Sequence, residues 1–225
     1  MIEQDKIREI ESIAKKYFLG VSVCHDWSHV DRVRNMALVI AKNENARSDL
    51  VEVAALLHDI GRKAEFACKA KNSDGTKFCH AREGAKEARK ILSKFDIDKF
   101  DIDNIVHCIE THRFRNEKIP KTPEAKALFD ADKLDSVGAV GVGRAFVFAG
   151  HFNTAMYTGQ EKEHAKNGKD YNFSKNDSAV LEYEIKLRHI KDKMLTKTGK
   201  KIALERDKFM REFFDRFFDE IEGKK

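Results

Sequence analysis

Apolar residues recur at spacings of three and four along the whole chain, which is the period of amphipathic α-helices. Residues 3–19 carry Ile7, Ile10, Ala14 and Tyr17 on one face. Alternating β-branched runs are absent, and the chain has only 2 prolines. The pattern therefore predicts an all-α protein. The other predicted helices cover residues 27–43, 48–60, 80–95, 99–113, 123–135, a glycine- and alanine-rich stretch at 136–150, and two segments after residue 177.

The helix predicted over residues 48–60 has an unusual end. It starts with Ser48 as a cap and an acidic first turn, continues through an apolar run, and stops at Gly61. The sequence LLHDIG places His58 and Asp59 in its last turn, where the apolar face should continue. Buried ionisable groups cost free energy unless they are paired or bind a metal, so this pair indicates a site.

Two long polar segments separate the predicted helices. Residues 61–79 are longer than a simple linker requires and are typical of a lid, and residues 151–177 form a second polar loop. In the last predicted helix, Phe209, Phe213 and Phe217 follow one another at four-residue spacing.

Composition narrows the class of protein. A chain of 225 residues suits one well-buried domain, and 41% hydrophobic with 36% charged residues excludes disorder. No apolar run approaches a membrane span and the start lacks a secretory signal, so we expect a cytoplasmic protein that does not bind membranes. The net charge of +5 comes from scattered lysines, which suits small anionic substrates as well as nucleic acid.

The cysteines do not form a recognisable metal or disulfide pattern. The chain has 4 of them, Cys24, Cys68, Cys79 and Cys108, with no C-x-x-C spacing. In a chain of this size and expected compartment they are interpreted as reduced thiols.

Four ionisable residues interrupt apolar helix patterns: His29, the pair His58 and Asp59, and Asp132. Neighbouring helix residues diverge by about 100°, so His58 and Asp59 reach one point only beyond the helix end, where other helices converge. Imidazole nitrogens and carboxylate oxygens there would suit Mn²⁺, Fe²⁺, Co²⁺, Ni²⁺ or Zn²⁺. The alternative is that each histidine is an ordinary structural residue.

These residues and their flanks resemble the HD superfamily of metal-dependent phosphohydrolases, whose name comes from the His-Asp dipeptide. Beyond LLHDIG and ADKLD, the similarity to the YedJ/YpgQ-type branch of small HD hydrolases extends through CHAREGAKEARKIL, IETHRFR, EAKALFDADKLDSVGAVGVGRAF and DKMLTKTGKKIALERDKFMREFFDRFFDEI. One departure is Glu182, where that branch often has a histidine.

The resemblance implies a single HD-type helical bundle over residues 1–225, with a metal-site core at about 21–150 and C-terminal helices at about 177–222 packing on it. The metal ligands that it implies are His29, His58, Asp59 and Asp132. Asp132 fits the family's Asp-basic-Leu pattern, although Asp130 and Asp135 lie close enough to leave the choice of carboxylate open.

Other residues near these ligands are candidates for catalysis and substrate binding. The candidate catalytic residues are Asp59, Asp135 and His112, and the candidate substrate-binding residues are Lys63, Lys133, Arg144 and His80. Several assignments have alternatives. His80 and His112 are also candidates for a second ion, and Asp135 for a surface ion pair. Arg62 and Arg113 are further candidates for phosphate binding. His25 is expected to orient His29 without binding the ion itself, whereas His151, His164 and His189 are interpreted as surface residues.

The resemblance favours hydrolysis at phosphorus. Hydroxide generated at a divalent ion would attack a nucleotide, with (deoxy)nucleoside triphosphate converted to monophosphate and pyrophosphate. Mn²⁺ is the expected ion, with Ni²⁺, Co²⁺, Fe²⁺ and Zn²⁺ as alternatives. Two rival hypotheses are a dinuclear-iron oxygenase and a non-catalytic nucleotide sensor. Nucleic-acid binding is the least favoured, and both monomer and homodimer remain open.

Overall fold

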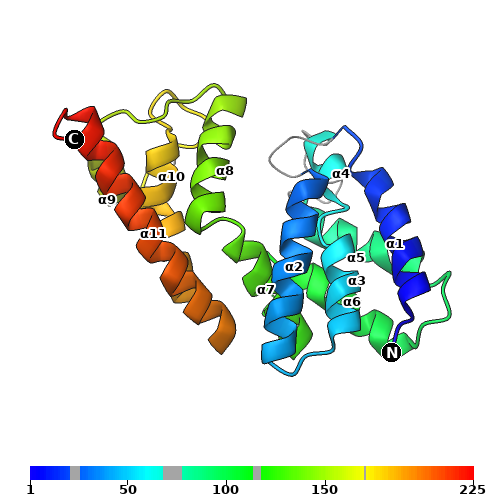
Figure 1. Cartoon of the computed structure of the whole chain (residues 1–225). Coiled ribbons are helices and arrows are strands. Elements are labelled where there is room, and N and C mark those ends of the chain that lie inside the picture. The colour runs from blue at the N-terminus through cyan, green and yellow to red at the C-terminus, as the bar shows by residue number, and fades with distance from the viewer. Residues whose placement is uncertain (21–25, 68–77, 114–117, 170) are drawn as a thin grey trace. The chain divides into compact units, whose positions relative to one another are not determined.

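The structure is a computed structural model that describes residues 1–20, 26–67, 78–113, 118–169 and 171–225. These residues form helices joined by turns, and their one bridge between extended segments pairs Ala155 with Ser178, so the predicted all-α class is confirmed (Figure 1). In chain order the elements are α1 (Gln4–Tyr17), α2 (Trp27–Asn43), α3 (Ser48–Leu57), α4 (Arg62–Ala67), α5 (His80–Leu92), α6 (Lys99–Thr111), α7 (Pro123–Leu134), α8 (Gly138–His151), α9 (Glu161–Asn167), α10 (Ala179–Ile185), the 3₁₀ helix η1 (Leu187–Lys193) and α11 (Lys197–Ile221).

The chain divides into two compact units. Residues Met1–Asp132 form the first, which contains α1 to α6 and most of α7. Residues Lys133–Lys225 form the second, which contains the end of α7, α8 to α10, η1 and α11. The expectation of one domain over the whole chain stays a prediction.

Helix α3 is the centre of the first unit. Every residue from Leu50 to Leu57 is buried, and the helix packs against α1, α2 and α6. Its one buried charge, Glu52, accepts a hydrogen bond of 2.9 Å from Arg34 Nε on α2. A helix that is apolar on nearly every side must lie inside its unit. Its C-terminus is therefore surrounded by neighbouring elements.

Both predicted ends of this helix differ from the structure. The N-cap is Arg47 rather than Ser48, and no side chain bonds there. Instead, Glu124 Oε1 on α7 accepts the Arg47 backbone N–H at 2.9 Å. At the other end, α3 stops at Leu57 because the chain tightens into a turn, in which Ile60 N–H donates to the carbonyl of Leu57 at 3.4 Å. His58 and Asp59 thus follow the helix rather than form its last turn.

The two polar segments contain short helices that the sequence pattern did not predict. Helix α4 lies in the segment expected as a loop from residue 61, and α9 lies in the segment 151–177. Neither is long enough to show an apolar period. The interpretation of His164 as a surface residue is wrong, because it is only 8% exposed and its ring stacks on Tyr171 at 4.3 Å.

Helix α11 organises the second unit through contacts with α8 and η1. Its buried face includes Met210 and Phe214, and the Phe214 ring stacks on Tyr183 of α10 at 4.1 Å. The phenylalanines noted at four-residue spacing lie beside this face, and Phe209 is 44% exposed. Gly138 has a φ of +79° and lies against Arg206, so a residue without a side chain suits the start of α8.

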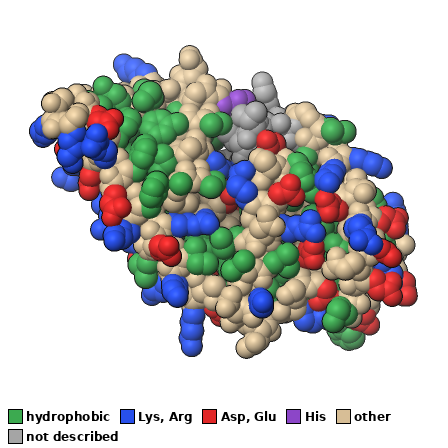
Figure 2. All heavy atoms as spheres, in the orientation of Figure 1, with side chains coloured by type: hydrophobic (Ala, Val, Ile, Leu, Met, Phe, Trp, Pro, Cys, Tyr) green, Lys and Arg blue, Asp and Glu red, His purple; other side chains and the backbone are tan. Residues whose placement is uncertain are grey.

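Acidic, basic and apolar side chains are interspersed on the face shown in Figure 2, as the scattered lysines of the sequence predict. In the described part of the chain, no helix combines the length and the apolarity needed to cross a membrane. Cys79 and Cys108 are free thiols, whereas Cys24 and Cys68 lie outside the described residues.

Candidate metal centre

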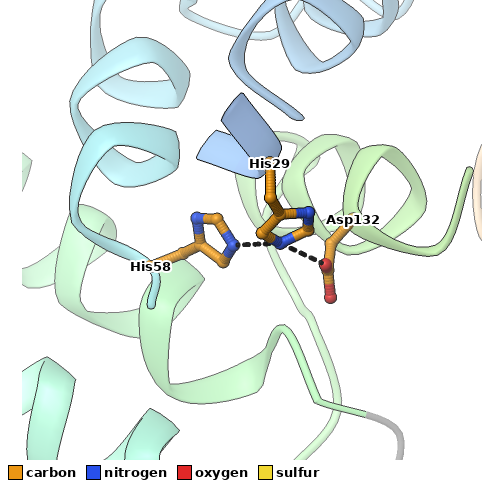
Figure 3. Close-up of side chains that lie close together, drawn as sticks. All are labelled: His29, His58 and Asp132. Atoms are coloured by element: carbon orange, nitrogen blue, oxygen red, sulfur yellow. Dashed lines mark hydrogen bonds and ion pairs between the residues drawn. The ribbon is translucent and has the colours of Figure 1, made fainter. Parts of the chain in front are cut away.

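Three elements bring His29, His58 and Asp132 together in the first unit (Figure 3). His29 lies in the first turn of α2, where the Asp26 side chain caps the helix by accepting the backbone N–H groups of Ser28 and His29. The Nε2 atoms of His29 and His58 are 3.3 Å apart, and His29 Nε2 is 3.5 Å from Asp132 Oδ1.

Asp59 completes a set of four potential ligands. Its Oδ2 atom lies 3.7 Å from His29 Nε2 and 3.7 Å from His58 Nε2. Two ligand atoms about 2.1 Å from a shared ion would be separated by about 3.0 Å at the right angle of an octahedron and by about 3.4 Å at a tetrahedral angle. The spacing therefore fits a single divalent ion, and the structure brings together all four residues that the sequence nominated as ligands.

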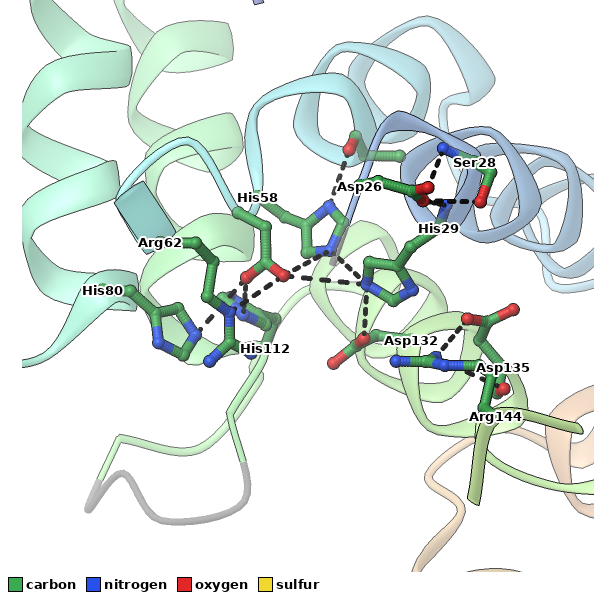
Figure 4. Close-up of polar contacts among 12 residues, drawn as sticks. Asp26, Ser28, His29, His58, Arg62, His80, His112, Asp132, Asp135 and Arg144 are labelled. Atoms are coloured by element: carbon green, nitrogen blue, oxygen red, sulfur yellow. Dashed lines mark hydrogen bonds and ion pairs between the residues drawn. The ribbon is translucent and has the colours of Figure 1, made fainter. Parts of the chain in front are cut away.

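The second oxygen of Asp59 faces another pair of histidines. Asp59 Oδ1 is 3.4 Å from His80 Nε2 and 3.5 Å from His112 Nε2 (Figure 4). His80 is the first residue of α5, and His112 directly follows α6. These three atoms form a second group with metal-ligand spacing, which shares one carboxylate with the first group.

Hydrogen bonds on the far side of the ring fix the orientation of two imidazoles, those of His58 and His112. Nδ1 of His58 is 2.7 Å from the carbonyl of Ala55, and Nδ1 of His112 is 2.6 Å from the carbonyl of Ile109. Because a carbonyl only accepts hydrogen bonds, Nδ1 carries the proton in both rings. Nε2 is then left with a lone pair that points toward Asp59.

Burial keeps the imidazoles of His58 and His80 neutral. Desolvation lowers the pKa of His58 to about 4 and that of His80 to about 3, even though the nearby Asp59 carboxylate raises both. His80 Nε2 is buried and makes no hydrogen bond within the described residues. Lone pairs facing a carboxylate repel it, whereas a cation between them would attract both. The residues present thus fit a divalent transition metal.

Arg62 and Glu65 on α4 support this arrangement from outside. Arg62 Nε donates to Asp59 Oδ2 at 3.0 Å, and Arg62 Nη1 donates to Glu65 Oε2 at 3.0 Å. Glu65 Oε2 also lies 2.7 Å from His80 Nδ1, and Oε1 accepts from Arg113 Nη1 at 3.3 Å. Burial raises the pKa of Glu65, but His80, Arg62 and Arg113 outweigh it and lower that pKa to about 2.

Sequence reasoning missed Glu65. It lies in a polar segment without an apolar period, seven residues after His58, and nothing local distinguishes it from a surface glutamate. Its partner Arg62 was considered as a phosphate ligand, but the structure places Arg62 against Asp59 and Glu65.

The other nominated residues lie in different surroundings. Lys63 is exposed and its Nζ donates to the carbonyl of Leu19 at 3.0 Å. Lys133, Asp135 and Arg144 belong to the second unit, where Arg144 forms an ion pair with Asp135. Their roles in binding phosphate and moving protons stay predictions. His25 lies outside the described residues.

The family model described as "HD domain" matches residues 26–137. Over 227 residues the chain is 33% identical to the uncharacterized protein YpgQ of Bacillus subtilis (strain 168), covering 99% of this chain and 97% of YpgQ.

Solved structures show the same fold. The crystal structure of Bacillus subtilis YpgQ in complex with ADP matches with a TM-score of 0.70 and 30% identity, over 96% of this chain and 98% of that one. A crystal structure of an HD-superfamily hydrolase from Bacillus thuringiensis matches with a TM-score of 0.71 and 25% identity, over 97% and 98%. A predicted HD-superfamily hydrolase from an uncultured Thermotogales bacterium gives a TM-score of 0.65 and 28% identity, over 95% and 91%.

The glycine that follows the dipeptide gives a first prediction. A Cβ atom at Gly61 would lie 2.3 Å from the carbonyl oxygen of His80 and 3.0 Å from Gly84 N, so Gly61→Ala forces α5 to move. We expect it to lower the free energy of unfolding by about 1–3 kcal/mol, as overpacking does. Chemical denaturation of the metal-free protein measures this.

Gly143→Ala is the matched control, because no atom lies within 4 Å of a Cβ at that position in α8. It should leave stability unchanged or raise it by about 0.5–1 kcal/mol, since alanine favours helices. Equal effects of the two substitutions would contradict the close approach of α5 to Gly61.

The lowered pKa values give a second prediction. The unfolded chain protonates its histidines near pH 6.5, whereas the folded protein protonates His58 and His80 only near pH 4 and pH 3. Lowering the pH from 6.5 therefore favours the unfolded state. We expect the urea midpoint of metal-free protein to fall between pH 6.5 and 5, above the range in which most carboxylates titrate. His189→Ala, at an exposed position, should show the same fall, and a constant midpoint would contradict burial of neutral rings.

Proposed function

The chain belongs to the HD domain family, and we propose that it is a metal-dependent phosphohydrolase that acts on nucleotides, converting (deoxy)nucleoside triphosphate to monophosphate and pyrophosphate. The observation that carries the proposal is the group around His29 Nε2, which lies 3.3 Å from His58 Nε2, 3.5 Å from Asp132 Oδ1 and 3.7 Å from Asp59 Oδ2. Its residue types suit a borderline divalent ion, and Mn²⁺ is our first choice.

A bound ion would lower the pKa of a coordinated water and polarise a phosphoryl oxygen. The residues of this chain would supply the rest. His29, His58, Asp59 and Asp132 would hold the ion, and four protein ligands leave positions open in an octahedral shell. The Ala55 carbonyl keeps the proton of His58 on Nδ1, and thus keeps its Nε2 available as a ligand.

We assign His80 and His112 to a second ion rather than to proton transfer. Both direct Nε2 toward the same oxygen of Asp59, at 3.4 Å and 3.5 Å. A proton carrier has to alternate between charged and neutral forms near neutral pH, and burial lowers the pKa of His80 to about 3.

The nucleotide part of the proposal is supported by the relative. YpgQ, which is 33% identical over nearly the whole of both chains, has been crystallised in complex with ADP. Phosphate groups carry the negative charge that a divalent ion attracts. A nucleotide substrate would therefore agree both with the candidate metal ligands of this chain and with the ADP complex of YpgQ.

The second group of ligands also favours one rival function. Two iron ions held by histidines and a shared carboxylate can activate oxygen, which would make the protein an oxygenase. Iron analysis that finds two ions per chain, together with oxygen uptake, would favour that function over hydrolysis.

The test is turnover of a nucleotide panel with Mn²⁺. Wild-type protein should release pyrophosphate or phosphate from at least one nucleoside triphosphate, and the double substitution His58→Ala with Asp59→Ala should abolish the release because it removes half of the proposed ligands. Chromatography of the nucleotide product would identify the bond that is cleaved.

His189→Ala is the matched control, since this histidine is exposed on η1. It should retain wild-type turnover. Release that persists in the double variant would sink the proposal, and tight nucleotide binding without turnover across several metals would indicate a sensor instead.

A further inference from the structure

His58, His80 and His112 each have a hydrogen-bond partner at Nδ1, but they do not occupy equivalent places relative to their helices. His58 and His112 each directly follow the last residue of a helix, and each imidazole bonds the carbonyl three residues earlier. The last carbonyls of a helix have no partner within it, so they are available to such a ring. The end of α3 and the end of α6 thus use the same local arrangement to hold an imidazole.

His80 cannot use that arrangement, because it is the first residue of α5. The N-terminus of a helix presents N–H groups rather than free carbonyls. A buried imidazole there needs an acceptor from another element, and Glu65 of α4 supplies it at 2.7 Å from His80 Nδ1. Helices α4 and α5 pack against each other, which places the carboxylate next to the ring.

Glu65 is itself held in place. Its Oε2 atom accepts from Arg62 at 3.0 Å, its Oε1 atom accepts from Arg113 at 3.3 Å, and Arg62 bonds Asp59 at 3.0 Å. A closed ring of contacts therefore runs from Asp59 through Arg62 and Glu65 to His80, whose Nε2 returns to Asp59 at 3.4 Å. Asp59 and His80 cannot change orientation independently.

The acceptor decides which nitrogen of His80 carries the proton. With a carboxylate at Nδ1, the proton stays there and Nε2 has a lone pair for a metal. Without it, the neutral ring gains more by placing the proton on Nε2, because Asp59 Oδ1 lies 3.4 Å away. An N–H group at that position would occupy the oxygen and close the second group of ligands to a cation.

We propose that Glu65 is a positioning residue that keeps His80 Nε2 unprotonated, and that it thereby allows Asp59 Oδ1, His80 and His112 to bind a second divalent ion. The proposal rests on the metal-dependent function proposed above. It concerns the second ion, because the Glu65 carboxylate contacts His80 directly and reaches Asp59, the ligand that both ions share, through Arg62.

Glu65→Gln is the variant that tests it. The amide has one oxygen for three donors, and its own N–H group repels the guanidinium of Arg62 or Arg113. Titration with Mn²⁺ by calorimetry should find two ions per wild-type chain. In Glu65→Gln the second ion should bind about 10–100-fold more weakly, as for the loss of other residues that orient metal ligands. The first ion should be affected less, because Glu65 reaches its ligand Asp59 through Arg62.

A second measurement needs no metal. Long-range ¹H–¹⁵N spectra of histidine rings should show Nδ1-protonated His80 in the metal-free wild type and a shift toward Nε2 protonation in Glu65→Gln, a change that general loosening of the fold would not produce. The control is Glu83→Gln on α5, whose carboxylate pairs with Lys86 at 2.9 Å and with Arg82. It should match the wild type in both measurements.

The outcomes separate the two proposals. Absence of any Mn²⁺ binding by the wild type would overturn the proposed function as well, and one ion per chain would overturn the second site alone. Two ions of unchanged affinity and an unchanged tautomer in Glu65→Gln would overturn the role of Glu65 and leave the metal centre standing. If that variant does not fold, Glu65→Asp, whose shorter side chain should leave His80 without its acceptor, is judged by the same outcomes.

Discussion

The carboxylate of Asp59 is the feature on which the rest of the centre depends. It is 1% exposed, and its two oxygens face two different groups of nitrogen atoms. A buried carboxylate needs positive charge close by, and two of the surrounding imidazoles, His58 and His80, are neutral because burial lowers their pKa. Arg62 supplies part of that charge at 3.0 Å. Divalent ions between Asp59 and the histidines would supply the remainder. The negative charge of the buried Asp59 carboxylate thus explains both the position of Arg62 and the proposed binding of metal ions.

The sequence was informative wherever the helical spacing of apolar residues continued over a long segment. On α1, three of the four residues expected on one face, Ile7, Ile10 and Ala14, are buried. The same regularity indicated the site, because His58 and Asp59 interrupt an apolar run that has to lie in the interior. Their convergence with His29 and Asp132 follows from α3 lying at the centre of its unit.

The features that escaped prediction depend on contacts between segments rather than on a period. Helix α4 has six residues, and its Glu65 acquires meaning only when α5 brings His80 against it. His164 was expected at the surface, but its ring is buried and stacks on the ring of Tyr171. The second group of ligands was left open for the same reason, since His80 and His112 follow no shared spacing with Asp59.

The placement of the ligands relative to helix ends has an electrostatic consequence. The C-terminus of a helix carries partial negative charge, so the ends of α3 and α6, where His58 and His112 lie, attract a cation as well as orient the rings. The N-terminus of α5, where His80 lies, carries partial positive charge and opposes a cation. Glu65 meets both needs of that position, because its carboxylate accepts the hydrogen bond of Nδ1–H, for which the start of α5 offers no free carbonyl, and adds a negative charge beside the helix end. A neutral acceptor could restore only the first, which is why a carboxylate is the residue type that the start of α5 requires.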